Sequence, residues 1–219
     1  MDQLKLLKAK AKEGGDPINY TTYEVLAGHI WKCVCRARAQ LDDQVTNLYF
    51  PVNGRFSRFQ PPVPSGYFGN VIFGALPSAI SGDIKSKPMS FAVSRVHEAL
   101  VQMNNDYLRS TIDYLGLQPD ISALKRGPHT YLCPNLGITS WMWMGGHDAD
   151  FGWGKPFFMG PGGIMFEGKS YVLPSGRDDG SLFVALALYP QHMKEFEKLF
   201  YEFDENKLVL ERSSLRANL

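Results

Sequence analysis

Glycine is concentrated in one part of the chain, and this concentration constrains the fold more than any other feature of the sequence. Glycine is placed where the backbone needs a positive φ or must approach another backbone closely. The segment therefore predicts tight structural turns beside a cleft rather than a group of reactive side chains. Its eight glycines are Gly145, Gly146, Gly152, Gly154, Gly160, Gly162, Gly163 and Gly168.

Trp153 lies between two of these glycines, in the sequence Asp150-Phe151-Gly152-Trp153-Gly154. A tight turn here would carry the indole into a packed site, so we interpret Trp153 as a large apolar anchor. The Asp150 carboxylate can fix the turn in either of two ways. It can bind a cation, or it can accept hydrogen bonds from backbone N–H groups.

A length of 219 residues and a hydrophobic content of 44% suit a substantial core. We expect one α/β domain over residues 1–219, with an ordered core at about 3–203 and a frayed tail at 204–219. Thr21 and Glu24 form a capping-box pattern, and the nearly all-apolar stretch 181–188 predicts a central strand covered on both faces. Periodicity predicts helices at 3–12, 21–39, 88–115 and 190–203, and strands at 45–52, 71–73, 136–142, 163–166, 170–173 and 181–188.

A net charge of +1 gives no reason to expect a nucleic acid or a membrane surface as partner. The basic run from Lys5 to Lys12 is interrupted by apolar residues and is interpreted as the solvated face of a helix. No stretch reaches the ~18 apolar residues of a membrane span, and the first residues are not typical of a signal peptide. We therefore expect a soluble protein of the cytoplasm.

The cysteines and histidines indicate no metal site and no cofactor. Cys33, Cys35 and Cys133 lack a zinc-type spacing and are expected to be free thiols. His29 is interpreted as a packed core residue and His97 as an exposed one. The remaining histidines, which lack a partner or enough neighbouring ligands, are His129, His147 and His192.

Two common catalytic motifs are excluded. The stretch from Gly160 to Gly163 lacks the Lys-Ser/Thr ending of a phosphate-binding loop and the spacing of a Rossmann turn, so a simple turn is predicted. A GxSxG sequence is also missing, which disfavours a serine hydrolase.

The stretch from Asp150 to Gly154 resembles the DFGWG signature of the plant BAHD acyltransferases, which use acyl-CoA donors. The likeness runs from about Leu4 to Phe203 and corresponds to the carboxy-terminal half of the family. It is carried further by residues 23–31, 66–70, 135–141 and 158–163, which are similar to the hydroxycinnamoyltransferase branch.

This resemblance implies a chloramphenicol-acetyltransferase-like domain, a mixed sheet flanked by helices, with the active site at the interface of two such domains. In the family, a histidine in a His-x-x-x-Asp motif of the amino-terminal half is the general base. We therefore expect no catalytic residue in this chain, an acyl-CoA co-substrate, and an inactive isolated half. None of the five histidines of this chain has an Asp four positions after it. The residues found there are Cys33, Val101, Cys133, Phe151 and Phe196.

The resemblance also implies roles for individual residues. Asp150 to Gly154 would be structural, and we expect Arg55 to form an ion pair with Asp150. Thr21, Thr22 and Arg58 would lie on the CoA side, where a cation can meet phosphates.

Strand alternation would place Thr139, Trp141 and Trp143 on one face, as a wall of the acceptor channel. Shikimate and quinate transferases of this branch have an arginine at the position of Trp143. An indole there favours an apolar or aromatic acceptor over an anionic one.

We expect the whole enzyme to transfer a hydroxycinnamoyl group from CoA to a hydroxyl or amine acceptor such as shikimate or quinate. Its partner would be an amino-terminal acyltransferase half. The alternative is a non-catalytic half that binds CoA esters or a partner protein through an exposed apolar interface.

Overall fold

The fold was analysed in a computed structural model, which describes residues 2–13, 15, 17–55, 58–124, 127–177 and 179–202. The predicted tail at 204–219 lies outside the described residues. The α-helices are α1 (Asp2–Ala11), α2 (Thr22–Ala37), α3 (Ser81–Ser86), α4 (Met89–Gln102), α5 (Asn105–Gly116) and α6 (Pro190–Phe200). Short 3-10 helices are η1 (Ile121–Leu124), η2 (Pro128–Thr130) and η3 (Gly145–Asp148). The strands are β1 (Val45–Asn53), β2 (Ile72–Ala75), β3 (Ser78–Ile80), β4 (Leu136–Ser140), β5 (Lys169–Pro174) and β6 (Leu182–Leu186).

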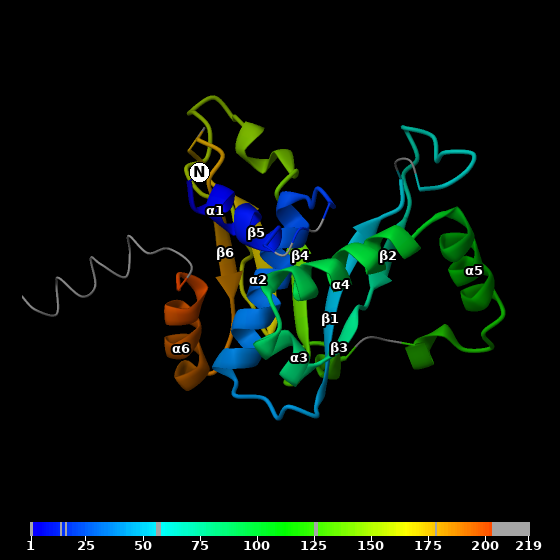
Figure 1. Cartoon of the computed structure of the whole chain (residues 1–219). Helices are drawn as coiled ribbons and strands as arrows, with labels where there is room; N and C mark the ends of the chain where they lie inside the picture. Colours follow the sequence, from blue (N-terminus) through cyan, green and yellow to red (C-terminus); the bar gives the residue numbers. More distant parts are fainter. Residues whose placement is uncertain are drawn as a thin grey trace, which may run out of the picture.

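The strands form one mixed sheet in the order β2-β1-β4-β5-β6, and β3 pairs with β1 beside β2 (Figure 1). β1, β4 and β5 run parallel to one another, whereas β2, β3 and β6 are antiparallel to their neighbours. The expected fold class, a mixed sheet with flanking helices, is confirmed.

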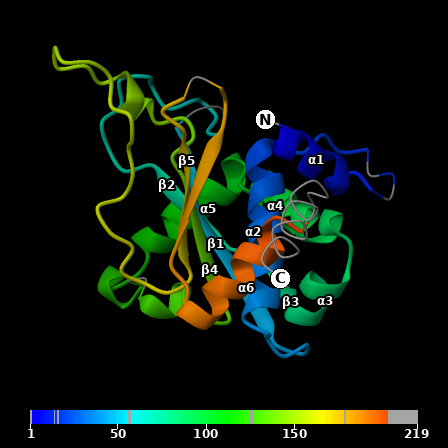
Figure 2. The same cartoon turned by 90° about the vertical axis from the view of Figure 1, so that its left-hand side faces the viewer.

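The long helices α1, α2, α4 and α6 gather on one face of the sheet (Figure 2). α2 lies in the middle of this layer and packs against α4, α6, α3 and α1. Its Ile30, Trp31 and Val34 are fully buried, and the Trp31 Nε1 donates to the Thr46 Oγ1 of β1 at 3.1 Å. The hydrophobic core therefore lies between α2 and the face of the sheet that carries Leu48, Ile138 and Val172.

The start of α2 is fixed by the capping box that the sequence predicts. The Thr21 side chain accepts from the Glu24 N–H at 3.2 Å, and the Glu24 Oε2 accepts from the Thr21 N–H at 2.5 Å. These bonds satisfy two N–H groups that a helix start otherwise leaves without partners.

Two predicted elements differ from the structure. The helix predicted at 88–115 is two helices, because the chain turns at Met103 and the Asn104 side chain caps α5 by accepting from the Tyr107 N–H. The strand predicted at 163–166 is a loop, and Met165 in it is largely exposed. Both β4 and β6 already occupy the edges of β5, so this segment has no strand partner there.

The prediction of a central strand at 181–188 is also wrong. β6 is the end strand of the sheet, and Phe183 on its helix-free face is 48% exposed. An all-apolar strand is typical of a sheet interior, but here helices cover one face only.

A buried ion pair joins the end of α2 to the loops that lead into β4 and β5. Arg38 donates to both Glu167 carboxylate oxygens at 2.8 Å and to the Asn135 carbonyl at 2.6 Å. The two side chains are 0% and 8% exposed. Gly168 follows with a φ of +80°, and a Cβ there would lie 2.0 Å from the Tyr131 carbonyl oxygen. This corner therefore fixes where β5 begins.

Breaking this pair should destabilise the chain far more than breaking an exposed one. Glu167→Gln leaves the buried Arg38 charge without its anion and should lower the free energy of unfolding by about 3–5 kcal/mol. The matched control is Glu202→Gln, which removes the exposed pair between Arg36 and Glu202 and should cost at most about 1 kcal/mol. Urea unfolding of both variants checks this, and equal losses would contradict it.

Candidate functional site

The face of the sheet opposite the helices carries the predicted channel residues. In the parallel pairing of β4 with β5, Gly137 lies beside Lys169 and Thr139 beside Tyr171, so these side chains share one face. The Lys169 Nζ donates to the Thr139 Oγ1 at 2.6 Å. The Trp141 and Tyr171 rings meet edge to face, with centroids 5.2 Å apart. The structure thus brings Thr139 and Trp141 together, as predicted.

Aromatic rings extend this surface towards β1. The Lys169 Nζ lies 4.9 Å from the centroid of Tyr131 and 5.1 Å from that of Tyr171. Tyr131 in turn stacks with Phe166 at 6.0 Å and meets Tyr49 of β1 at 5.9 Å. The surface offers flat apolar contact with one ammonium group in it, which suits an aromatic or acyl group.

Neither Lys169 nor Tyr171 was predicted to belong to the site. The alternation of side chains within 169–173 places Lys169 and Tyr171 on one face of a strand, and this pattern could have indicated them. What the sequence lacks is the pairing register that brings this face beside Thr139.

Trp143 does not belong to this wall. β4 ends at Ser140, and Trp143 lies in the following turn with a 93% exposed side chain. The predicted common face of Trp141 and Trp143 is therefore wrong, because strand alternation stops before Trp143.

The Asp150 carboxylate accepts hydrogen bonds from two backbone N–H groups. Its Oδ1 accepts from the Gly152 N–H at 2.8 Å and from the Gly154 N–H at 3.1 Å. Both glycines have a positive φ, +100° and +103°, which explains why glycine stands at both positions. Of the two predicted roles of this carboxylate, the structure shows the acceptance of hydrogen bonds from backbone N–H groups.

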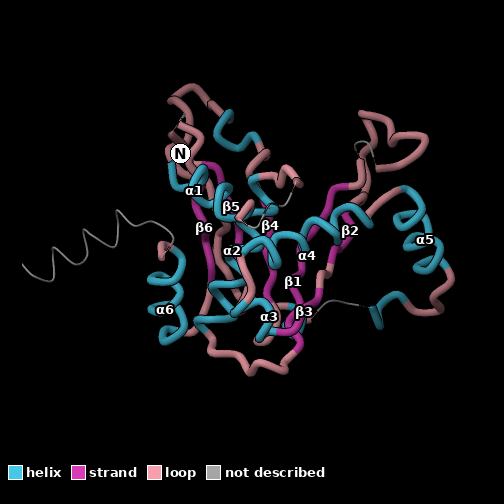
Figure 3. The backbone as a smooth tube through the Cα atoms, viewed as in Figure 1, coloured by secondary structure: helices cyan, strands magenta, loops and turns pink. Residues whose placement is uncertain are grey.

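The ion pair predicted between Asp150 and Arg55 is absent, although both residues are described. The Arg55 guanidinium donates to the Asn53 side chain and to the Gly69 carbonyl. The loop between β1 and β2 and the loop between β4 and β5 extend from the sheet at separate places (Figure 3). The two residues therefore cannot meet within this arrangement.

The sequence indicated that Trp153 is an anchor in a packed site, and this interpretation is wrong. Its side chain is 86% exposed, and that of Phe151 is 78% exposed. These residues belong to an exposed aromatic segment, which we define as Trp143, Phe151, Trp153, Phe157, Phe158 and Met165. Large apolar side chains exposed together in one segment between two strands are typical of an interaction site.

The predicted CoA-side residues have structural contacts in this chain. The Thr21 hydroxyl is used by the capping box. The Arg58 Nη1 donates to the carbonyls of Leu100 at 3.0 Å and Met103 at 2.8 Å, at the end of α4. Burial lowers the pKa of the Arg58 guanidinium from its usual value. Contacts of Thr21, Thr22 and Arg58 with CoA stay predictions.

The histidines of the helical layer are engaged in packing. The His29 Nε2 lies 2.8 Å from the Phe200 carbonyl, and burial lowers the pKa of its imidazole to about 4. The interpretation of His29 as a core residue is confirmed. His97 is half-buried, not exposed, because its Nδ1 lies 2.7 Å from the buried Glu24 carboxylate.

The thiols match their predicted state. Cys33, Cys35 and Cys133 are free, and the first two are buried. Burial raises the pKa of the Cys33 thiol to about 12 and that of Cys35 to about 11, so both stay protonated at neutral pH.

The described part of the chain has neither a metal-binding cluster nor a membrane-spanning helix. It holds no group of three or more His, Cys, Asp or Glu side chains placed to bind a metal ion. None of its helices has the length and apolarity needed to span a membrane.

Neutral His29 should make the stability depend on pH. Below about pH 6.5 the unfolded chain binds a proton at this imidazole, whereas the folded chain binds it only near pH 4. Stability is therefore lost as the pH falls from about 6.5 to 4, by about 3 kcal/mol from this group. The His29→Gln variant should lack this part of the slope in urea unfolding, and the exposed-site control His129→Gln should keep it. Equal slopes for wild type and His29→Gln would contradict the assignment.

Comparison with known proteins gives a consistent result. The sequence profile of the Transferase family matches residues 1–203. The chain is 58% identical over 202 residues to shikimate O-hydroxycinnamoyltransferase of Nicotiana tabacum, which covers 92% of this chain and 46% of that protein. It is 51% identical over 205 residues to rosmarinate synthase of Plectranthus scutellarioides, with coverage of 92% and 47%. The chain thus spans about half the length of these relatives.

Solved structures show the same fold. TRI101 of F. sporotrichioides, in complex with coenzyme A and T-2, matches with a TM-score of 0.72 at 23% identity, over 90% of this chain and 46% of that one. Vinorine synthase matches with a TM-score of 0.69 at 19% identity, over 92% and 45%. In both, the similarity covers about half of the larger protein.

Proposed function

This chain belongs to the Transferase family of BAHD acyltransferases, and we propose that it is the carboxy-terminal half of an enzyme that transfers a hydroxycinnamoyl group from CoA to a hydroxyl or amine acceptor. The observation that carries the proposal is the 58% identity over 202 residues to a shikimate O-hydroxycinnamoyltransferase. The helix-free sheet face with Thr139, Trp141 and Tyr171 supports it, because such a face needs a covering partner.

The reaction is a direct acyl transfer. A general base takes the proton of the acceptor, the acceptor oxygen or nitrogen attacks the thioester carbonyl, and the CoA thiolate leaves. None of the five histidines of this chain is followed by Asp at the fifth position, so the base comes from the amino-terminal half. This half contributes the wall.

In this proposal the residues of the wall bind and orient the substrates. The rings of Trp141, Tyr171 and Tyr131 present flat surfaces to the aromatic acyl group and keep water away from the thioester. The Lys169 ammonium beside these rings donates a hydrogen bond to the Thr139 hydroxyl, so both are polar groups of this wall. Binding energy on this face therefore positions the donor or acceptor for attack.

The partner and the location are part of the same proposal. The exposed aromatic segment would be covered by the amino-terminal half, and Asp150 to Gly154 would hold it in shape. A cytoplasmic location agrees with three free cysteines. A non-catalytic half that binds CoA esters or a partner protein through this segment is the second candidate, favoured by the 86% exposure of Trp153.

Activity should require both halves. The isolated chain should give no acyl transfer from p-coumaroyl-CoA, because it lacks the base. Co-expression with the part of the tobacco relative that this chain does not match should restore product formation, measured by liquid chromatography. Turnover by the isolated chain would contradict the proposal, and a stable but inactive complex would favour the second candidate.

Trp143 lies outside the wall, but it occupies the position at which shikimate and quinate transferases of this branch have an arginine, so we expect it to influence the choice of acceptor in the restored enzyme. Trp143→Arg supplies a guanidinium that binds a carboxylate bidentately and should raise kcat/KM for shikimate about tenfold. The control Trp143→Gln removes the indole without adding a charge and should give no such gain. Since Trp143 is 93% exposed, neither change should disturb folding. An unchanged kcat/KM in Trp143→Arg would refute this role.

A further inference from the structure

The backbone of strand β6 is open on one side. β6 pairs with β5 and, among the described strands, with no other. The Ser175 N–H donates to the Ser181 carbonyl and the Ala187 N–H to the Lys169 carbonyl, so odd-numbered residues bond to β5. In an antiparallel ladder, the residues between them point their N–H and C=O groups the other way. The free edge therefore presents the backbone of Leu182, Val184 and Leu186.

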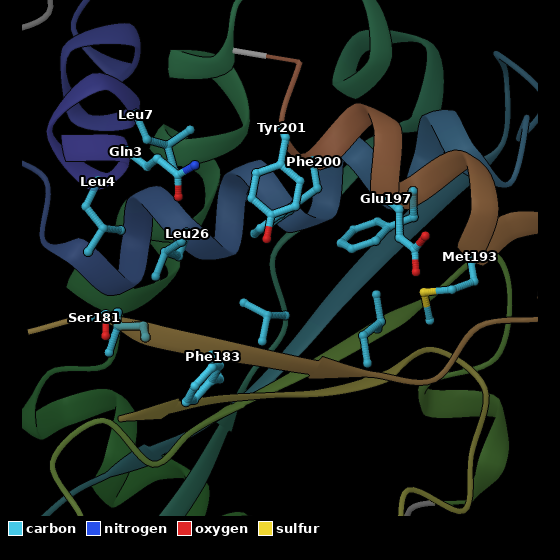
Figure 4. Close-up of a pocket in the computed structure, with 14 residues that line it drawn as sticks. Gln3, Leu4, Leu7, Leu26, Ser181, Phe183, Met193, Glu197, Phe200 and Tyr201 are labelled. Atoms are coloured by element: carbon cyan, nitrogen blue, oxygen red, sulfur yellow. The ribbon is translucent and has the colours of Figure 1, made fainter. Parts of the chain in front are cut away.

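An apolar groove of about 330 Å³ lies beside this edge. In Figure 4, α1 and α6 run above β6, and their apolar side chains point into the space between them. Leu182, Val184 and Leu186 form its floor, and Gln3, Ser181 and Glu197 are its polar residues. The other side chains that line it are Leu4, Leu7, Leu26, Phe183, Met193, Phe196, Phe200 and Tyr201.

Nothing in the sequence of β6 protects this edge. Natural proteins blunt a free edge with charges, proline or a very short strand. Leu182–Leu186 is five apolar residues without charge or proline. The opposite edge of the sheet is divided between β2 and β3, which have only four and three residues. An unprotected edge over an apolar groove is suited to strand addition.

We propose that an extended segment of the amino-terminal acyltransferase half adds to β6 as a further strand and covers the groove between α1 and α6. This inference rests on the proposed function. It is supported by the length of the relatives, since this chain covers 46% of the tobacco protein and leaves the rest to pack against it. Gln3 and Leu4, in the first turn of α1, line the groove together with residues of β6.

The geometry defines the segment. It has about five residues, or about 17 Å of strand, to match Leu182–Leu186. Its apolar side chains alternate, because every second one faces the groove. A lysine or arginine at the end near Glu197 complements the carboxylate on the groove wall.

Amide hydrogen exchange resolved at single residues tests this arrangement. The probe is the part of the tobacco shikimate O-hydroxycinnamoyltransferase outside the matched region, co-expressed with this chain as a separate polypeptide. In the chain alone, the amides of Leu182, Val184 and Leu186 should exchange faster than those of Phe183, Ala185 and Ala187. In the complex the first three should slow by about tenfold or more.

Three outcomes would overturn the proposal. The first is a complex that forms without slower exchange at Leu182, Val184 and Leu186, which means that the edge stays free. The second is a failure of the two polypeptides to associate. The third is a dimer of the chain alone, detected by light scattering, with these amides protected as the concentration rises, which makes a second copy the occupant.

A variant pair tests the backbone contribution. Val184→Pro removes an N–H that faces the free edge and breaks no bond to β5, and proline is tolerated in edge strands. It should weaken the complex about tenfold in Kd. Val184→Thr keeps both the N–H and the shape, and its Kd should stay within about threefold. Equal Kd values for the two variants would count against strand addition, provided that circular dichroism shows both folded.

Failure of this inference is distinguishable from failure of the proposed function. Slower exchange at the three amides in a complex without acyl transfer would support the strand and refute the activity. Acyl transfer by a complex in which the three amides still exchange fast would support the activity and refute the added strand.

Discussion

A sheet has two faces and two edges, and the described long helices α1, α2, α4 and α6 all lie on one face of this sheet. α2 is the reason: it packs across β1 and β4, and its buried residues include Ile30, Trp31 and Val34. α4 and α6 then pack against α2. Burial of apolar surface is the main stabilising contribution, and here it is concentrated on this side. The other face and the β6 edge are left for something else to cover.

The uncovered surfaces share a chemistry. The helix-free face carries Trp141, Tyr171 and Tyr131, the exposed aromatic segment extends from it, and β6 presents an apolar edge. A complete domain of this size ordinarily buries such groups. Membership of a family whose proteins are about twice as long gives the simplest physical account, because one partner can cover all three surfaces.

Local sequence patterns predicted the local structure well. The Thr21–Glu24 capping box, the strand at 45–52 and the helix that starts at Pro190 depend on neighbouring residues only, and all are present. The break at Met103 was missed because the apolar stripe continues through it, while the cap at Asn104 is a single residue. The glycine turns at Gly152 and Gly154 were also predictable, since a positive φ is a local requirement.

What the sequence could not provide was which surface each element meets. A central strand and an apolar edge strand have the same sequence pattern, so β6 was wrongly predicted to lie in the centre of the sheet. Trp153 has the sequence pattern of a packed anchor, but its side chain is 86% exposed in this structure. Lys169 was missed because its neighbour Thr139 lies thirty positions away and is brought there by strand pairing. The surroundings of β6, Trp153 and Lys169 all depend on contacts between residues far apart in the sequence, which local propensity does not predict.

The mass of the native protein in its source tissue tests the central claim most directly, namely that this chain is one half of a two-half enzyme. An immunoblot and light scattering of the purified material would give the mass of the polypeptide and of its assembly. The account predicts a polypeptide or a complex of about twice 24.6 kDa. A monomer of 24.6 kDa with no associated chain would contradict it, because the aromatic face and the β6 edge would then stay uncovered.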